Sequence, residues 1–434
     1  MKKLLFLLFI PVFTFSQSDI TDITDINEKI ERLSLGVEKN VIKWRRHIHQ
    51  NPELSNREFL TAKYVAAHLK SLGIEVQENV AHTGVVGILK GGLPGKVVAL
   101  RADMDALPVT ERVNIPFASK VKTIYKDVEV GVMHACGHDT HVAILMGVAS
   151  VLKEMQKEIK GTVKFIFQPA EEGPPAGEEG GAELMVKEGV LKSPDVDVIF
   201  GLHISSDLPV NKLAYKPGGT LASATSFEVK IKGSQAHGSK PWAGADPIVA
   251  GAQIINNIQT IVSRNLDLTN EAAVVTIGRF ESGIRSNIIP EEAYMEGTIR
   301  ALDYEMRDVI YKRLDEIISY TAKSNNVEAE LILGNPYPIT FNDLALTEQM
   351  KNTLIRVAGE KNIVLARAST GAEDFSYFAN EIPGFFFRLG GMPNEDHPNK
   401  GYSHHTPDFY VDDSGLVLGV RAMLNLTFDY LNAN

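Results

Sequence analysis

Residues 133–141 concentrate side chains that can bind a metal ion. Within nine residues the chain places His134, Cys136, His138, Asp139 and His141. Cys136 and His138 stand two residues apart, so a loop that turns at Gly137 can present a thiolate and an imidazole together. A buried structural cysteine is the simpler interpretation of Cys136 alone, but the density of donors favours a metal site.

Carboxylates and an imidazole also follow three apolar stretches that we predict to be buried strands. The stretches are residues 96–102, 162–167 and 196–201, and the side chains at or after their ends are Asp103, Asp105, Glu171, Glu172 and His203. Each side chain alone could be a solvated loop charge. In open parallel sheets, however, ligands bind at the carboxyl ends of the strands. We therefore expect these groups at one sheet edge, where the helix after the 133–138 loop also begins.

The tandem pair Glu171 and Glu172 suits metal-assisted hydrolysis. On an extended segment, neighbouring carboxylates point in different directions, so one can bind the metal while the other faces the substrate as general base. A bound divalent ion lowers the pKa of its water, and the free glutamate can pass a proton to the leaving amine. We interpret the later acids Glu178 and Glu179 as an exposed charged loop.

Two further segments carry polar groups whose role cannot be assigned from the segment alone. His404 and His405 form an imidazole pair near a proline, and residues 369–376 form a glycine-containing turn with acids. Neither segment would justify a functional assignment alone, because surface histidine pairs are common.

The first half of the chain alternates helices and strands. Apolar residues recur at helical spacing over 26–48, a capping box at 55–58 predicts a helix through Leu69 that ends at Gly73, and another helix is predicted over 141–159. Together with the three buried strands, this order predicts an α/β fold with a mixed, mostly parallel sheet and helices on both faces.

The pattern changes after about residue 222. Residues 226–232, 273–278 and 293–300 alternate apolar and polar side chains, and helical stretches cover 247–263 and 306–324. Alternation of this kind suits half-exposed antiparallel strands. We predict an inserted α+β domain at 223–336 between two parts of a catalytic domain, 26–222 and 337–434.

Composition limits the class of protein. The chain has 434 residues, 44% hydrophobic, a single cysteine and a formal charge of -10, which excludes disordered and disulfide-stapled proteins and disfavours nucleic-acid and anionic-membrane binders. An anionic substrate would therefore need a local basic cluster.

The N-terminus has the order of a secretory signal peptide. Lys2 and Lys3 precede a short apolar run that is followed by small polar residues. We predict a signal peptide at 1–17 and an exported protein, periplasmic or extracellular, that is not attached to a membrane after cleavage; an uncleaved anchor is the alternative.

Six motifs occur in order and resemble a known family. They are Trp44-Arg-Arg-His-Ile-His-Gln-Asn-Pro-Glu-Leu-Ser, Arg101-Ala-Asp-Met-Asp-Ala-Leu-Pro, Met133-His-Ala-Cys-Gly-His-Asp, Phe167-Gln-Pro-Ala-Glu-Glu-Gly, Gly201-Leu-His and Ala236-His-Gly-Ser-Lys-Pro. Over residues 38–430 the chain resembles the amidohydrolase branch of the aminoacylase/carboxypeptidase metallopeptidases. This branch includes hippurate hydrolases, auxin-conjugate hydrolases and N-acetyldiaminopimelate deacetylases.

The resemblance implies a two-metal exopeptidase-like catalytic domain with a ferredoxin-like lid that forms a homodimer. It makes Glu171 the general base, Asp105 a residue that orients a ligating histidine, and Cys136 a thiolate able to bridge two ions. The implied metal ligands are Cys136, His138, Glu172, His203 and His405. His405 is preferred because Thr-Pro follows it, and His404 is the alternative.

The resemblance also implies roles in the lid. His237 is similar to a histidine that polarises the scissile carbonyl, commonly across a dimer interface. Asn287 and Arg300 are similar to residues that hold the substrate carboxylate, and an arginine fork suits that task. The alternative is that all three are merely exposed or paired structurally.

We therefore expect a metal-dependent amidohydrolase that cleaves N-acyl-amino acids, hippurate-like or N-acetylated, with two divalent ions per subunit. A thiolate favours zinc, whereas the carboxylate and imidazoles also suit manganese, cobalt or nickel. An exported carboxypeptidase or dipeptidase acting on short peptides is the first alternative. A catalytically silent metal-binding or ligand-binding protein is the second, and the presence of Glu171 beside the ligands argues against it.

Overall fold

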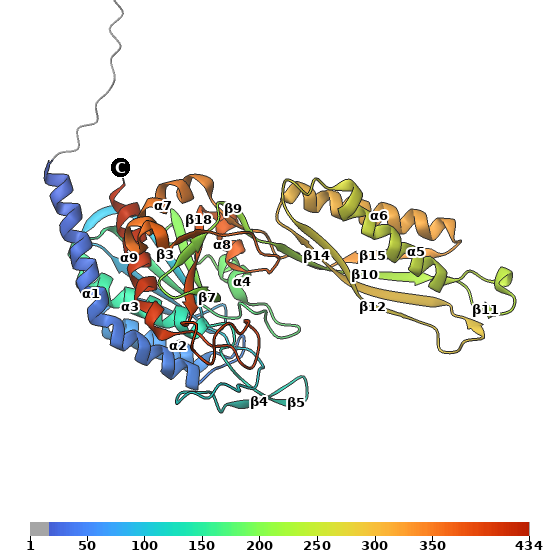
Figure 1. Ribbon diagram of the computed structural model, residues 1–434, viewed down its shortest axis with the longest axis horizontal. Helices are drawn as coiled ribbons and strands as arrows, with labels where there is room; N and C mark the ends of the chain where they lie inside the picture. The colour runs from blue at the N-terminus through green and yellow to red at the C-terminus, as the bar shows by residue number, and fades with distance from the viewer. Residues whose placement is uncertain (1–16, 434) are drawn as a thin grey trace, which may run out of the picture.

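The computed structural model describes residues 17–433, so the predicted signal peptide lies outside the described residues apart from Gln17. The described chain forms a compact body and an extended arm (Figure 1). The arm begins with a strand at Ser223, and its last strand ends at Leu333.

The body is built on a mixed sheet whose central strands are parallel. In spatial order its strands are β1 (Glu75–Val80), β2 (Gly84–Lys90), β6 (Lys160–Gln168), β3 (Leu93–Asp103), β7 (Val198–Pro209), β18 (Gly384–Met392), β8 (Leu213–Tyr215) and β17 (Ile363–Leu365). β6, β3, β7 and β18 run parallel to their neighbours in this group, whereas β1, β2 and β8 add antiparallel pairs. The predicted fold class is confirmed.

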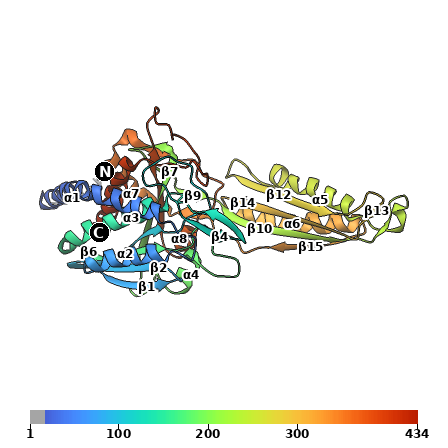
Figure 2. The ribbon, with the colours of Figure 1, turned by 90° about the horizontal axis from the view of Figure 1, so that it is seen from below.

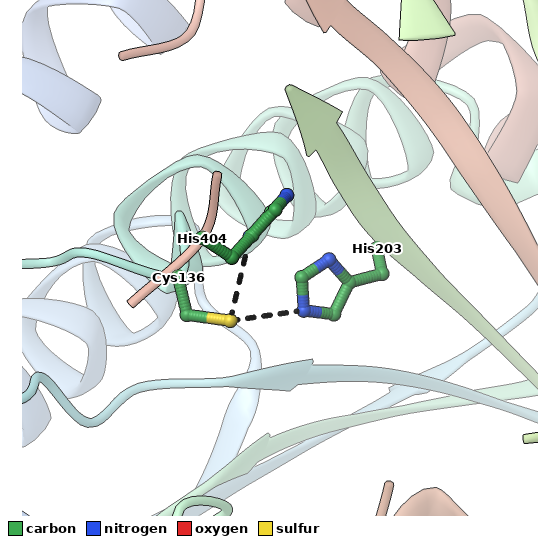
Figure 3. A group of neighbouring side chains, drawn as sticks. All are labelled: Cys136, His203 and His404. Atoms are coloured by element: carbon green, nitrogen blue, oxygen red, sulfur yellow. Dashed lines mark hydrogen bonds between the residues drawn. The ribbon is translucent and has the colours of Figure 1, made fainter. Parts of the chain in front are cut away.

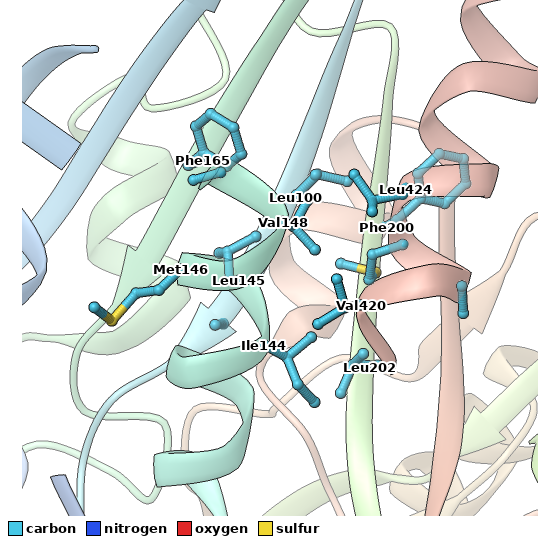
Figure 4. Close-up of a cluster of buried hydrophobic side chains, with 14 of the residues drawn as sticks. Leu100, Ile144, Leu145, Met146, Val148, Phe165, Phe200, Leu202, Val420 and Leu424 are labelled. Atoms are coloured by element: carbon cyan, nitrogen blue, oxygen red, sulfur yellow. The ribbon is translucent and has the colours of Figure 1, made fainter. Parts of the chain in front are cut away.

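Helices cover both faces of this sheet. One face carries α1 (Gln17–Gln50), α2 (Phe59–Ser71), α3 (His138–Glu154), α7 (Leu344–Ala358) and α9 (Leu416–Asn432), and the other carries α4 (Gly181–Lys187) and α8 (Phe375–Glu381). Successive strand residues point to opposite faces, so Phe200 packs in the first core and Ile199 in the second. Figure 4 shows Phe200 beside Leu424 in the first core.

The predicted capping box at 55–58 is wrong. Helix α2 begins at Phe59, and the side chain of Glu58 does not cap it. The Glu53 carboxylate instead accepts hydrogen bonds from the backbone N–H groups of Leu60 and Thr61, at 2.9 and 2.8 Å for Oε2. The Ser55 hydroxyl is therefore free to donate to Asp105 instead.

The arm is an antiparallel sheet with two helices on one face. Its strands are β12 (Ala273–Ser282), β14 (Glu292–Ala301), β10 (Ser223–Lys232) and β15 (Glu328–Leu333), and its helices are α5 (Pro247–Thr260) and α6 (Tyr304–Ser324). Phe227, Ile254, Ile299 and Leu314 belong to its separate core. The short pair β11 (Ala236–His237) and β13 (Ile288–Ile289) lies at the far tip (Figure 2). This architecture is the predicted inserted α+β domain.

The remaining short elements connect these layers. They are β4 (Lys122–Tyr125), β5 (Val128–Gly131), β9 (Gly218–Leu221), β16 (Thr340–Asn342), the 3-10 turns Gln156–Glu158, Pro241–Ala243, Glu360–Asn362 and Asp413–Gly415, and a π-helical turn Ile261–Asn265. Over residues 17–433, none of the helices has the length and apolar character needed to cross a membrane.

Candidate metal centre

A cavity of about 310 Å³ lies at the carboxyl edge of the body sheet. The turn after β6, strand β7 and the loop before α3 bring several of its polar groups to this edge, where ligands bind in open parallel sheets. Its lining residues are Cys136, Glu171, Glu172, His203, Leu221, Ala224, Tyr337, Ala372, Glu373 and His405.

Three imidazoles meet at the sulfur of Cys136. The Sγ atom lies 3.4 Å from His203 Nε2, 3.6 Å from His404 Nδ1 and 3.3 Å from His405 Nε2. Figure 3 shows the first two of these side chains converging on the sulfur from β7 and from the C-terminal loop. Glu172 Oε1 lies 3.1 Å from His405 Nε2, so a carboxylate joins the group.

His138 faces the same space from the first turn of α3. Its Nδ1 lies 2.9 Å from the Asp105 carbonyl oxygen, and its Nε2 has no hydrogen-bond partner within the described residues. That nitrogen lies 3.7 Å from Glu171 Oε2 and 4.0 Å from Glu172 Oε1. A buried imidazole nitrogen without a partner is costly unless a ligand satisfies it.

Asp105 orients several members of this group at once. Its Oδ1 accepts from the backbone N–H of Glu171 at 3.1 Å and lies 3.2 Å from His138 Nδ1. Its Oδ2 accepts from the backbone N–H of Glu172 at 3.1 Å and from the Ser55 hydroxyl at 2.6 Å. The hydroxyl that the sequence suggested as a helix cap therefore belongs to the site.

Glu171 and Glu172 do not lie on an extended segment, which corrects the sequence-based expectation. They occupy a turn that follows Ala170, whose φ is +51°. Both carboxylates consequently approach the same nitrogen of His138 instead of pointing in different directions. Glu178, by contrast, forms an ion pair with Arg57 away from the cavity, as expected of a charged loop.

Hydrogen bonds on the far ring nitrogens decide which histidines can offer a lone pair. His203 Nδ1 lies 2.6 Å from the Ile204 carbonyl oxygen and must donate to it, which leaves Nε2 free to bind a cation. His404 is reversed: its Nε2 accepts from the Ser206 N–H at 3.2 Å, so in the neutral ring Nδ1 carries the proton toward the sulfur.

His141 is fully engaged by protein groups. Its Nδ1 lies 2.5 Å from Asp103 Oδ1, and its Nε2 accepts from the Ile204 N–H at 2.8 Å. The ring therefore joins β3 to β7 and leaves no nitrogen for a metal. Asp139 also turns away from the cavity, because it lies 2.8 Å from both Arg45 Nε and His49 Nδ1.

The donor set fits a pair of divalent cations. Cys136 is shared by two groups of donor atoms, one with Glu172 and His405 and one with His203 and His404, and His138 stands with both glutamates in a third. Soft thiolate with imidazole and carboxylate suits zinc, manganese, cobalt or nickel. Among the described residues, Nε2 of His138 is buried without a hydrogen-bond partner, as expected of a nitrogen that binds a cation.

The electrostatics of the site point the same way. Hydrogen bonds to Cys136 and then to Glu172 raise the pKa of His405 to about 10. Burial, followed by the charges of Glu373 and Glu172, raises the pKa of Glu171 well above its ordinary value.

A buried ionic cluster supports the floor of the cavity. Arg101 donates to Asp103 at 2.7 Å, to Glu373 at 2.9 Å and to Asp374 at 2.8 Å. Burial raises the pKa of Asp374 to about 8 despite this guanidinium. Asp103, which the sequence left without a role, thus connects Arg101 to His141.

The three predicted lid residues are not brought together within one chain. His237 is exposed at the tip of the arm, and the Asn287 carbonyl accepts from the Gly238 N–H at 2.9 Å beside it. Arg300 lies at the other end of the arm, in register with Ala224, which lines the cavity. Arg300 is half-buried and donates to Thr298 and the Ile299 carbonyl, without an acidic partner in the described chain.

Sequence reasoning missed two residues that line the cavity. Glu373 comes from the acid-containing turn at 369–376, whose glycine and acids were the available signal. Tyr337 reaches the cavity through a backbone bridge to Ala224, and no local pattern marks it.

Comparison with known proteins identifies relatives along almost the whole chain. Residues 99–429 match the description "Peptidase family M20/M25/M40". The chain is 41% identical to thermostable carboxypeptidase 2 of Saccharolobus solfataricus, covering 94% of this chain and 100% of that protein. It is 36% identical to an N-acetyl-L-cysteine deacetylase of Bacillus subtilis, covering 92% and 91%. The crystal structure of a dinuclear metal-binding peptidase of the M20 family from Bacillus subtilis superposes with a TM-score of 0.77 at 35% identity, covering 92% and 99%.

Proposed function

Because the chain belongs to peptidase family M20/M25/M40 and is a metal-dependent hydrolase of amide bonds, we propose that it releases amino acids from N-acyl-amino acids with two divalent cations. The observation that carries this proposal is the convergence of three imidazoles and a carboxylate on Cys136, with the Glu171 carboxylate beside them. This arrangement has both a cation site and a base.

The proposed ligands are Cys136, Glu172, His203 and His405, which line the cavity, and His138, whose buried Nε2 lies beside both glutamates. We assign His405 rather than His404, because the Ser206 N–H engages His404 Nε2 and turns an N–H toward the sulfur. His404 is then a hydrogen-bond donor to the thiolate.

When bound, the cations act as Lewis acids toward the scissile carbonyl and make water a better nucleophile. Glu171 accepts a proton as water attacks the carbonyl carbon, and it passes this proton to the nitrogen as the C–N bond breaks. The products are a carboxylate and an amine.

Asp105 positions the reacting groups. It accepts hydrogen bonds from the backbone of both Glu171 and Glu172 and holds Nδ1 of His138. One carboxylate therefore sets the distance between the base and two ligands. Residues in this position raise ligand basicity and fix ring orientation.

Arg300 is the proposed anchor for the α-carboxylate of the substrate. Its side chain is half-buried next to a cavity-lining strand and has no acidic partner among the described residues. His237 and Asn287, far away on the exposed tip, would serve the site of a second subunit. We accordingly propose a homodimer formed through the arm.

A carboxypeptidase or dipeptidase acting on short peptides is the second candidate, favoured by the 41% identity with a carboxypeptidase. The two activities differ in whether the acyl side of the scissile bond carries its own amino group. We further propose export to the periplasm or the extracellular space, based on the order of charges and apolar residues over 1–17.

The test is a substrate panel with purified protein. Hippurate, N-acetyl-amino acids, auxin conjugates and dipeptides are assayed with added zinc, manganese, cobalt or nickel. Turnover of N-acyl-amino acids above dipeptides supports the proposal, and the reverse order favours the peptidase. If no substrate is turned over with any of the metals, both the amidohydrolase and the peptidase activities are contradicted, and a catalytically silent metal-binding protein is favoured.

A further inference from the structure

A second hollow, of about 500 Å³, adjoins the metal centre. It is lined by the end of β7, by β8 and β18, and by the segment before α8. Its polar lining is Ser205, Asp207, Arg367, Ser369, Thr370 and Arg388.

Arg388 connects this hollow to the metal centre. It lies on β18 in register with His203 on the parallel strand β7. Paired residues on adjacent strands are about 4.8 Å apart and point to the same face. His203 lines the first cavity and Arg388 the second.

One stretch of backbone separates the two cavities. Ser369, in the second hollow, forms a backbone bridge with Leu221, which lines the metal cavity. Ala372 and Glu373, a few residues further on, line the metal cavity as well. The hollow therefore lies beside the metal centre on the same face of the sheet, with Arg388 next to His203.

The charge of the hollow is unbalanced toward positive. Arg388 is half-buried, and the guanidinium groups of Arg388 and Arg367 form no ion pair or hydrogen bond with the described residues. Asp207 is the acid in the lining, and its Oδ1 accepts from the Ser205 hydroxyl at 2.5 Å. The lining therefore contains two guanidinium groups and one carboxylate, and that carboxylate already accepts a hydrogen bond from Ser205.

The same chain pairs its buried guanidinium groups with acids. Arg45 meets Asp139 and Asp413, and Arg101 meets Asp103 and two further carboxylates. Arg388 and Arg300 are half-buried and have no acidic partner among the described residues. For Arg388 this points to a ligand that supplies the missing anion, since a planar fork matches a carboxylate in bidentate geometry.

We propose that this hollow is a subsite for a carboxylate at the acyl end of the substrate. The inference rests on the proposed function, and it names a substrate class: N-acyl-amino acids whose acyl group comes from a short dicarboxylic acid. The metal centre would hold the amide while Arg388 and Arg367 hold the distal carboxylate.

The test compares acyl groups of equal length. N-succinyl-amino and N-butyryl-amino acids, and the glutaryl and valeryl pair, differ only in the terminal carboxylate. Wild-type protein is expected to show a kcat/KM at least tenfold higher for the charged member. Arg388→Gln should lower the ratio of charged to neutral kcat/KM by about 10- to 100-fold, Arg367→Gln should lower it less, and Arg388→Lys should partly restore it.

The control is Arg32→Gln, an exposed arginine on α1, which covers the opposite face of the sheet. It should leave the ratio unchanged, and thermal unfolding of each variant checks folding. Because Arg367 is exposed, Arg367→Gln should fold and can test the subsite even if Arg388→Gln does not fold. The subsite is overturned if the ratio of charged to neutral kcat/KM is near one in the wild type, or if neither arginine variant changes it. Turnover of the neutral substrates would still support the proposed function in that case.

Direct binding separates the subsite from the reaction. Calorimetry with succinate, glutarate and inorganic phosphate on metal-loaded protein should show dicarboxylate binding at least tenfold weaker in Arg388→Gln. If no substrate is hydrolysed, the proposed function fails and this measurement still decides the subsite. Binding of phosphate in the absence of any dicarboxylate preference indicates a site for free anions and overturns the substrate role.

Discussion

Substitution of Asp105 by Asn provides the sharpest test of how the metal centre is assembled. The carboxylate receives two backbone N–H groups, the Ser55 hydroxyl and the ring of His138. Although burial opposes it, hydrogen bonding from His138 lowers the pKa of Asp105, so the group is ionised. An amide of equal size keeps the shape but offers only one acceptor oxygen.

The magnitude follows from these contacts. In the best orientation the amide oxygen of the Asp105→Asn side chain stays toward His138 and the Glu171 N–H, and the amide NH2 takes the place of Oδ2. The Ser55 hydroxyl can accept a hydrogen bond from this NH2 group. The Glu172 N–H is itself a donor and loses its acceptor. One buried N–H is then left unsatisfied at a cost of about 1–3 kcal/mol. If this cost appears at the ligands, metal affinity falls by about 5- to 150-fold.

The assay is metal competition with a chelator, combined with metal content after dialysis and kcat on an N-acyl-amino acid. Asp303→Asn is the matched control, because Asp303 caps α6 in the arm through the Met306 N–H. We expect weak metal binding and low kcat in the Asp105 variant alone. Wild-type metal affinity and kcat in that variant would refute the positioning role.

Three other predictions address neighbouring groups. Glu171→Gln should retain both metals, measured by elemental analysis, and lose at least 100-fold in kcat, since the amide cannot accept a proton; retained activity would remove Glu171 from the mechanism. His405→Ala should lose metal, whereas His404→Asn, which keeps an N–H near the Nδ1 position, should retain it; equal loss in both would contradict the assignment made from ring hydrogen bonds. Burial, followed by Asp105, raises the pKa of Glu58 to about 8, so stability present at low pH should be lost as pH rises from about 4.5 through 8. Glu58→Gln mimics the protonated acid toward Thr83, and its thermal unfolding temperature should fall less than that of the wild type between pH 5 and 9; parallel curves would contradict the raised pKa.

Local patterns were sufficient where one segment carries the information. The buried strands and the alternating strands of the arm follow from apolar periodicity, because a strand buried on two faces and a strand buried on one face need different residues. Cys136 and His138 were recognisable because the loop and the first turn of a helix bring them together over a short span.

Contacts between distant segments were the source of the errors. Ser55 lies before a helix with Glu58 three residues later, as a capping box requires, yet its hydroxyl is bound by Asp105 from β3. Glu373 and Tyr337 reach the cavity from segments more than 100 residues away from the strand ends they face. No local rule records such pairings, since each depends on how the sheet and its loops pack.

Residue order therefore established the chemistry of this protein: a thiolate, imidazoles and carboxylates at strand ends, and the α/β class that gathers strand ends at one edge. Packing alone determined the allocation of those groups. Asp103 holds Nδ1 of His141, the Ser206 N–H binds Nε2 of His404, and Nε2 of His138 has no partner among residues 17–433. The physical reason is that a ring nitrogen offers its lone pair to a cation when the other ring nitrogen donates to an acceptor, as His203 Nδ1 does to the Ile204 carbonyl. Whether an acceptor or a donor lies beside that second nitrogen is a property of the folded molecule.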